Sequence, residues 1–408
     1  MTPRLSGLLA LLWFVSFAAN GQEFDILLKG GRVIDPRNSI DRKSDVAVKD
    51  GRIVLVQPGI DSKRAGKVID VRGLIISPGL IDIHTHVFVG GKAERFADGA
   101  YSVSADDFCP RYGVTTAVDA GTSGWRNFEW FKFNVIDRSQ TRILAFLNIA
   151  GGGMSGDPDQ QRVEDMDAEA TAAMIRKHPG TLVGVKLGHY EGEDRAPLDR
   201  TFQAASSSGT PVLVECHLPR YPLAEQLERM RPGDIITHSF EKITERAAVI
   251  DSAGRLRPEV VTAKERGIRF DLGHGGYGFW FSQALPASRQ GLWPHTFGTD
   301  MHRFSVNAGM KGMTLVLSKF LNMGMPLPDI IRRATWNAAE SLNRSDLGHL
   351  APGAQADITV LSIRKGRFGF TDSGGDRLDG RRRIEAEMTI RDGRILWDLN
   401  GRSAKPLH

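Results

Sequence analysis

Short apolar runs alternate with polar residues at both ends of the chain. From Phe24 the sequence "FDILLKGGRVIDPRNSIDRKSDVAVKDGRIVLVQPG" is broken by Gly-Gly, Pro-Arg-Asn and Asp-Gly turns, which is the pattern of hairpin strands. The segments "QADITVLSI" and "EAEMTIRDGRILWDLNG" repeat this pattern near the C-terminus and share the Asp-Gly-Arg-Ile turn. We therefore predict one small β-sandwich domain built from both chain ends, residues 22–77 and 346–402, with residues 78–345 inserted between them.

Between residues 78 and 345 the pattern changes to short, continuously apolar runs, each followed by a segment that can form a helix. The expected strands cover residues 80–84, 115–119, 143–149, 182–186, 212–215, 235–237, 268–272 and 296–299. Eight strand–helix units in this length predict an α/β fold with a (β/α)8 TIM barrel. A doubly wound open sheet is the alternative, although the Gly-rich dinucleotide motif is missing after the first expected strand.

The first 21 residues have the composition of a secretory signal peptide. Arg4 provides a positive charge, residues 8–19 are apolar, and small residues follow them, as in cleaved export signals. The apolar run is shorter than the roughly 20 residues of a membrane-spanning helix, and it contains no cysteine to carry a lipid. We predict an exported protein, periplasmic or secreted, without a stable membrane anchor; an uncleaved anchor is the alternative.

The composition is that of an ordinary globular protein, with 41% hydrophobic and 25% charged residues, which argues against a disordered or fibrous chain. A formal charge of +5 is small for 408 residues, and the basic run at 381–383 has no interleaved aromatic residues. A solvated protein surface explains this basic run, so we expect no nucleic-acid partner. We expect a small-molecule substrate instead. With only two cysteines there is no disulfide framework. The sequence is compatible with a homo-oligomer.

Polar side chains stand at the ends of most expected strands of the middle region. They are His84 and His86 on the first, Lys186 on the fourth, His217 on the fifth, His238 on the sixth, His274 after the seventh and Asp300 on the eighth. Active sites of barrel enzymes lie at the carboxyl ends of the strands, and imidazole and carboxylate groups suit zinc and other first-row metals. One histidine alone would carry little weight, but the set predicts a metal centre.

Lys186 is the unusual member of this set, because a bare cation beside metal ions is costly. A salt bridge to a nearby acid such as Glu215 is one explanation. Carboxylation of the amine by carbon dioxide is the other, since it creates an anionic ligand that can bridge two metals.

The order His-X-His, Lys, His, His, Asp resembles the amidohydrolase superfamily, as do "ISPGLIDIHTH" at the front and "GHLAPGAQADITVL" at the back. The segments "TTAVDAGTSGW", "FDLGHGG" and "GTDMH" resemble its amidohydrolase/deacetylase branch, which is related to dihydroorotases and D-aminoacylases. The resemblance implies two divalent metals, zinc by default, with manganese, iron or cobalt also open. It implies that His84, His86 and Asp300 bind the first metal and His217 and His238 the second, with carboxylated Lys186 and a hydroxide between them.

The implied reaction is hydrolysis of an amide, or of an ester, by metal-activated hydroxide, with Asp300 passing the proton to the leaving group. We expect an N-acyl amino acid or a similar small acylated acid as substrate. His274, His189 and Tyr190 are the candidate substrate contacts, because they follow the seventh and fourth expected strands. The alternatives are a cyclic-amide hydrolase of the dihydroorotase or hydantoinase type, and a metal-binding scaffold without turnover.

Overall fold

The computed structural model describes residues 22–156, 159–215, 221–242, 248–405 and 407. The predicted signal peptide, residues 1–21, and the predicted ligand His217 lie outside these residues. None of the helices in the described part of the chain combines the length and apolar character needed to cross a membrane.

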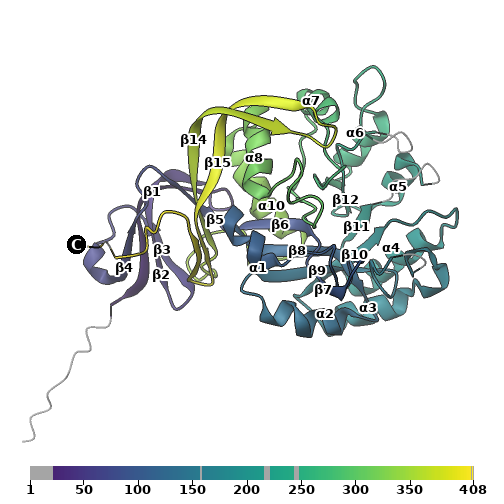
Figure 1. Cartoon of the computed structure of the whole chain (residues 1–408), viewed down its shortest axis with the longest axis horizontal. Coiled ribbons are helices and arrows are strands. Elements are labelled where there is room, and N and C mark those ends of the chain that lie inside the picture. The colour runs from purple at the N-terminus through teal and green to yellow at the C-terminus, as the bar shows by residue number, and fades with distance from the viewer. Residues whose placement is uncertain (1–21, 157–158, 216–220, 243–247, 406, 408) are drawn as a thin grey trace, which may run out of the picture.

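Both chain ends contribute to one sheet, which is seen on one side of the molecule in Figure 1. The strands run in the order β16-β15-β14-β5-β1-β2-β3, and β4 pairs with β1. Pairing of Ile76 with Val360 joins the N-terminal strands to the C-terminal ones, as the shared pattern predicts. The bounds are β1 Phe24–Asp35, β2 Ile40–Lys49, β3 Arg52–Gln57, β4 Ala65–Asp70, β5 Ile75–Pro78, β14 Ile358–Thr371, β15 Arg377–Arg391 and β16 Arg394–Asp398.

The middle of the chain forms a seven-stranded parallel sheet in the order β13-β12-β11-β10-β9-β8-β6. The bounds are β6 Leu80–Thr85, β8 Val114–Gly124, β9 Arg142–Asn148, β10 Leu182–Gly188, β11 Val212–Glu215, β12 Ile235–Ile236 and β13 Arg269–Phe270, and β7 Val89–Lys92 follows β6. The eighth expected strand, residues 296–299, makes single parallel bridges instead of a ladder. Thr296 bridges to Asp271 and Met301 bridges to Thr85, which links this segment to both edges of the sheet.

Helices follow the parallel strands, so the α/β class predicted from the alternation is confirmed (Figure 1). Their bounds are α1 Ala105–Phe108, α2 Phe128–Asn134, α3 Ala168–Lys177, α4 Ala196–Ser208, α5 Leu223–Arg229, α6 Pro258–Glu265, α7 Phe281–Arg289, α8 Met313–Asn322, α9 Leu327–Ala334 and α10 Trp336–Ser341. Local signals set some ends: the Asp167 carboxylate caps α3 by accepting from the amides of Glu169 and Ala170, and α4 ends at Gly209 in the left-handed region.

Side chains alternate between the two faces of the parallel strands, and this alternation positions the site. On β11, Val212 and Val214 pack in the large cluster shared with the surrounding helices. Leu213 faces the other way, into a cluster that includes Phe146, Ile235 and residues of α10. We call this second cluster the inner cluster. Residues two positions further along a strand share its face, so Glu215 lies on the inner side.

The long β14–β15 hairpin extends from the mixed sheet to the parallel-strand region (Figure 1). Near its tip, the Asp372 carboxylate accepts a hydrogen bond from the Phe281 amide at 2.8 Å, and the Ser373 amide donates to the Phe279 carbonyl at 2.8 Å. The hairpin therefore fixes the loop that precedes α7, which carries Tyr277 into the pocket described below.

Candidate active site

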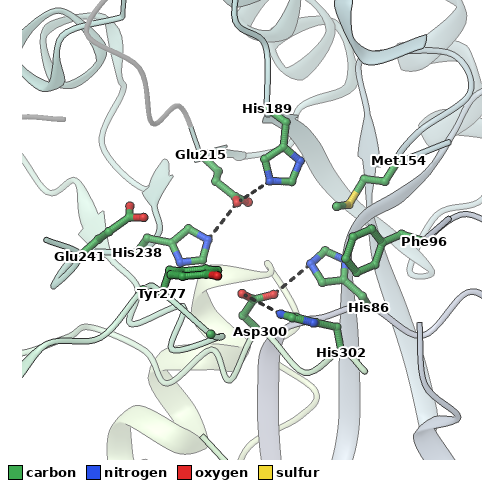
Figure 2. Close-up of a pocket in the computed structure, with 12 residues that line it drawn as sticks. His86, Phe96, Met154, His189, Glu215, His238, Glu241, Tyr277, Asp300 and His302 are labelled. Atoms are coloured by element: carbon green, nitrogen blue, oxygen red, sulfur yellow. Dashed lines mark hydrogen bonds and ion pairs between the residues drawn. The ribbon is translucent and has the colours of Figure 1, made fainter. Parts of the chain in front are cut away.

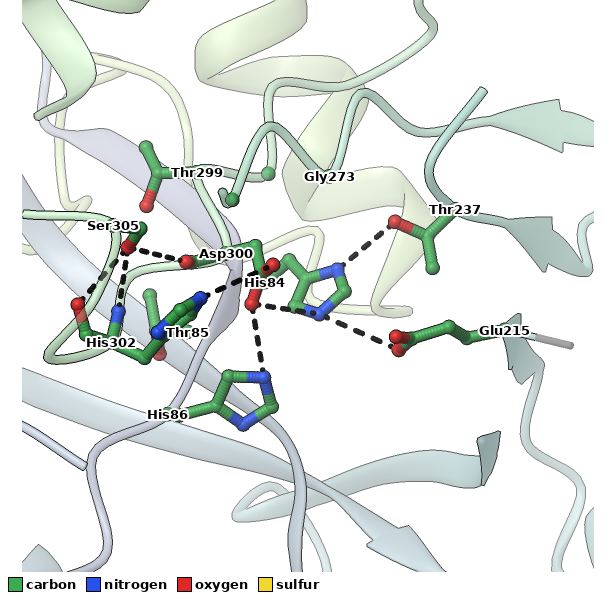
Figure 3. Close-up of polar contacts among 12 residues, drawn as sticks. His84, Thr85, His86, Glu215, Thr237, Gly273, Thr299, Asp300, His302 and Ser305 are labelled. Carbon is green, nitrogen blue, oxygen red and sulfur yellow. Dashed lines mark hydrogen bonds and ion pairs between the residues drawn. The ribbon is translucent and has the colours of Figure 1, made fainter. Parts of the chain in front are cut away.

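Polar side chains from the carboxyl ends of β6, β11 and β12 and from the segment 296–301 converge in two groups (Figures 2 and 3). His84, His86 and Asp300 form the first group, and His84, Glu215 and His238 form the second; all five residues are buried. In the first group the Asp300 Oδ1 atom lies 3.1 Å from His86 Nε2 and 3.7 Å from His84 Nε2. The structure thus brings together four of the residues predicted as metal ligands.

The second group is built around the Glu215 carboxylate. Its Oε1 atom lies 3.0 Å from His238 Nε2, and its Oε2 atom lies 3.9 Å from His84 Nε2. The sequence argument considered Glu215 only as a partner for Lys186. The signal that was missed is the alternation on β11, which gives Glu215 the same face as Leu213.

Hydrogen bonds on the outer side of each imidazole fix its orientation. The Nδ1 atom of His84 lies 2.9 Å from the Thr237 hydroxyl, and that of His86 lies 2.9 Å from the Thr122 hydroxyl. His238 Nδ1 lies 2.6 Å from the Gly273 carbonyl, which can only accept. Each Nε2 atom is therefore turned toward the carboxylates in the centre.

The residues present fit a metal ion. His84 Nε2 is fully buried and makes no hydrogen bond to the residues that the structure describes, which is costly for a polar atom unless another group binds it. Imidazole nitrogens and carboxylate oxygens at this spacing are the ligands of zinc and related metals. Second-layer groups such as Thr237, which orient a metal-binding histidine through its other nitrogen, are usual at such sites.

Lys186, at the end of β10, is buried and donates a hydrogen bond to Glu215 Oε2. The salt bridge named as one explanation for Lys186 is therefore present. The carboxylation of Lys186 stays a prediction.

Burial and neighbouring charges shift the pKa values of the group in the absence of metal. Burial and the Lys186 charge lower the pKa of His84 to about 4. Burial also opposes a proton on His238, but the Glu215 carboxylate outweighs it and raises the pKa of His238 to about 9. For Asp300 burial acts in the opposite direction, yet the imidazoles of His302, His84 and His86 hold its pKa well below the ordinary value. Asp300 is therefore an ionised carboxylate.

Three residues of the site have left-handed backbone angles: His189, His238 and Asp300, with φ values of 60°, 54° and 50°. Such angles are uncommon outside glycine and asparagine and are often found at functional sites. His189 and His238 follow the ends of parallel strands, and Asp300 follows the segment 296–299, so the backbone turns sharply where each side chain enters the site.

A cavity of about 360 Å³ opens beside the two groups (Figure 2). It is lined by His86, Phe96, Met154, His189, Glu215, His238, Glu241, Gly276, Tyr277, Gly278, Asp300 and His302. Phe96, Met154, Glu241 and Tyr277 were not found by sequence reasoning, because they come from loops whose paths have no periodic signal.

The predicted substrate contacts have different positions relative to this cavity. His189 lines it, and its Nε2 atom lies 3.0 Å from Glu215 Oε1. Tyr190 is buried and packs edge-to-face against Tyr221, and it does not line the cavity. His274 is also buried away from it, with Nε2 at 2.5 Å from the Lys319 ammonium.

The Gly-rich turn around His274 does reach the cavity, through Gly276 and Gly278. However, the Gly278 amide donates to the His274 carbonyl at 3.0 Å, and the Gly275 amide donates to the Thr299 carbonyl at 2.9 Å. These two amides stabilise the turn and are not available to a substrate carboxylate.

Comparison with known proteins agrees with this geometry. Residues 289–377 match the model of the amidohydrolase family. A deacetylase of Brucella anthropi is 30% identical over 308 residues, which cover 72% of this chain and 73% of that protein. The chain belongs to the amidohydrolase superfamily. This confirms the family indicated by the sequence motifs, and with it a hydrolase of carbon–nitrogen bonds.

Other similar proteins of this superfamily have different activities. A deacetylase of Enterococcus faecalis is 27% identical, over 77% of this chain and 85% of that protein. The crystal structure of an adenine deaminase superposes with a TM-score of 0.83 and 26% identity, covering 92% of this chain and all (100%) of the other. A dihydroorotase gives a TM-score of 0.79 and 27% identity, covering 91% and 99%.

Proposed function

We propose that this amidohydrolase is an exported, metal-dependent deacetylase that hydrolyses the amide bond, or an equivalent ester bond, of an N-acyl amino acid or a similar small acylated acid. The observation that carries the proposal is the pair of buried ligand groups that share His84 and border the 360 Å³ cavity. The similarity to proteins named deacetylases, at 30% identity, supports the choice of reaction.

Two divalent ions, zinc by default, are the expected cofactors. His84, His86 and Asp300 would hold one, and His238 would contribute to the other. The resemblance to the superfamily implies His217 and carboxylated Lys186 as the further ligands of this second ion. When bound, the metals would supply a hydroxide nucleophile at neutral pH and polarise the scissile carbonyl.

Asp300 is the residue best placed to move the proton. Its carboxylate lies at the cavity wall and is ionised, so it can accept a proton at Oδ2 while Oδ1 faces His86 and His84. The proton then passes to the leaving nitrogen. His302, whose Nε2 atom lies 3.8 Å from Oδ2, stabilises the charge of the carboxylate.

The apolar part of the cavity suits a short acyl group. Phe96 and Met154 form one side, and the exposed ring of Tyr277 lies across from them (Figure 2). A ring-opening reaction on a cyclic amide is the second candidate, because the dihydroorotase superposes over 91% of this chain.

A substrate screen with metal-reconstituted enzyme tests the proposal. N-acetyl and N-formyl derivatives of D- and L-amino acids should be hydrolysed, and a chelator should abolish turnover until metal is restored. Turnover of hydantoins or dihydroorotate alone would favour the cyclic-amide hydrolase. Bound metal without turnover of any of these compounds would favour a non-catalytic scaffold.

A further inference from the structure

Strand β11 presents a carboxylate where the family resemblance leads one to expect a histidine. We propose that Glu215 is a direct metal ligand in this chain, and that Lys186 remains an unmodified ammonium group that holds Glu215 in position. This inference rests on the proposed metal dependence. It differs from the ligand set carried over from the family, which uses His217 and carboxylated Lys186.

The position of Glu215 on its strand supports this assignment. Glu215 is the last residue of β11, and its partner in the neighbouring ladder is Gly188, at the end of β10. It follows Leu213 of the inner cluster by two residues, so its side chain enters the site from the same face. The side chain is buried, with 4% of its residue surface exposed.

The two carboxylate oxygens of Glu215 point in different directions. Oε1 faces His238 Nε2 at 3.0 Å, and Oε2 lies on the side of His84 Nε2 at 3.9 Å. His84 also belongs to the group of His86 and Asp300. The Glu215 carboxylate thus lies beside His84, the residue that the two ligand groups share, and on the opposite side of it from Asp300 (Figure 3), where it can bind the metal of the second group.

Lys186 is 1% exposed and donates a hydrogen bond to Glu215 Oε2. As an ammonium it forms a buried ion pair with the carboxylate. A carbamate would lack the ammonium protons, one of which Glu215 Oε2 accepts, and would place a second buried anion against Glu215. With Glu215 present, an anionic oxygen ligand is available without any modification of Lys186.

Metal analysis of the purified protein tests this ligand assignment. We expect Glu215→Gln to lose at least one of about two metal equivalents after dialysis, whereas Glu241→Gln should keep the wild-type content. Glu241 is a suitable control, because it is a buried carboxylate of the same cavity that belongs to neither ligand group. If the single variant fails to fold, Glu215→Asp keeps the charge that pairs with Lys186 and should still bind less metal, because its carboxylate is one methylene group farther from His84 and His238.

A second measurement tests the state of Lys186. Metal-loaded wild-type enzyme in 13C-bicarbonate should show no carbamate resonance in its 13C NMR spectrum, and bicarbonate should not change its metal uptake.

The outcomes separate this inference from the proposed function. If the wild type binds no metal, the proposed function itself fails. If the wild type binds metal and Glu215→Gln retains all of it while His217→Ala loses it, only the Glu215 assignment fails. A carbamate resonance that is absent from Lys186→Met would overturn the ammonium role of Lys186.

Discussion

The replacement Asp271→Asn should weaken metal binding without touching a metal ligand. Asp271 is fully buried and accepts three hydrogen bonds. Oδ2 accepts from the Thr237 hydroxyl at 2.8 Å. Oδ1 accepts from the Thr296 hydroxyl at 2.7 Å and from the Gly298 amide at 2.8 Å. Because the single Thr237 proton is given to Asp271, Thr237 must accept from His84 Nδ1, and His84 Nε2 keeps a lone pair for the metal.

Asparagine at this position reverses the direction of that chain. The Gly298 amide can only donate, so the asparagine oxygen must take the Oδ1 position and its NH2 group must face Thr237. The Thr237 hydroxyl then points its proton at His84 Nδ1, and the ring is forced into the tautomer that carries a proton on Nε2. That tautomer cannot bind a metal through Nε2.

Changes to groups that orient a ligand usually lower metal affinity by about 10- to 100-fold, which corresponds to about 1.4 to 2.8 kcal/mol. We expect a loss in this range for Asp271→Asn, measured as a zinc dissociation constant by competition with a chromophoric chelator. Thr296→Val is the matched control, because it removes a donor to the other oxygen of Asp271 and leaves Thr237 unchanged. A dissociation constant for Asp271→Asn equal to that of the control would refute the tautomer argument.

Three further predictions follow from single observations. Asp300→Asn should keep much of the metal but lower kcat by about 10²- to 10⁴-fold, the usual loss for general acid–base catalysis; full metal with near-normal turnover would contradict this. Burial lowers the pKa of Lys319 from 10.5 to about 7. Between these pH values the unfolded chain therefore binds more protons than the folded chain, and the free energy of unfolding should rise with pH. Thermal melting of Lys319→Met at several pH values should lack this rise. Mass spectrometry should place the mature N-terminus between Ala19 and Gln22, and an intact Met1 on cytoplasmic protein would argue against export.

The sequence could predict which strands carry the site, but not how deep each side chain sits. Alternation shows that residues 215 and 217 share a face of the fifth strand. It does not show which of them lies at the level of His84 and His238, because that depends on the ladder between β10 and β11. The structure places Glu215 opposite Gly188 and next to both histidines.

The eighth expected strand shows a related limit. Its apolar and β-branched residues predict a strand, but single bridges at Thr296 and Met301 connect this segment to the sheet. Asp82 explains part of this difference, because its carboxylate accepts from the Thr299 amide at 2.9 Å and from the Thr299 hydroxyl at 2.5 Å. These side-chain bonds replace ladder bonds at the point where the chain must turn to present Asp300.

The direction of the hydrogen bonds explains why the centre needs a cation. The Gly273 carbonyl requires a proton on His238 Nδ1, and Thr237 requires one on His84 Nδ1. The His84 ring, which is neutral, therefore turns a lone pair on Nε2 toward the carboxylates of Glu215 and Asp300. Facing lone pairs repel each other in a buried site, where no water screens them. A divalent metal between them turns this repulsion into coordination, so the same contacts that orient the histidines favour metal binding at the strand ends.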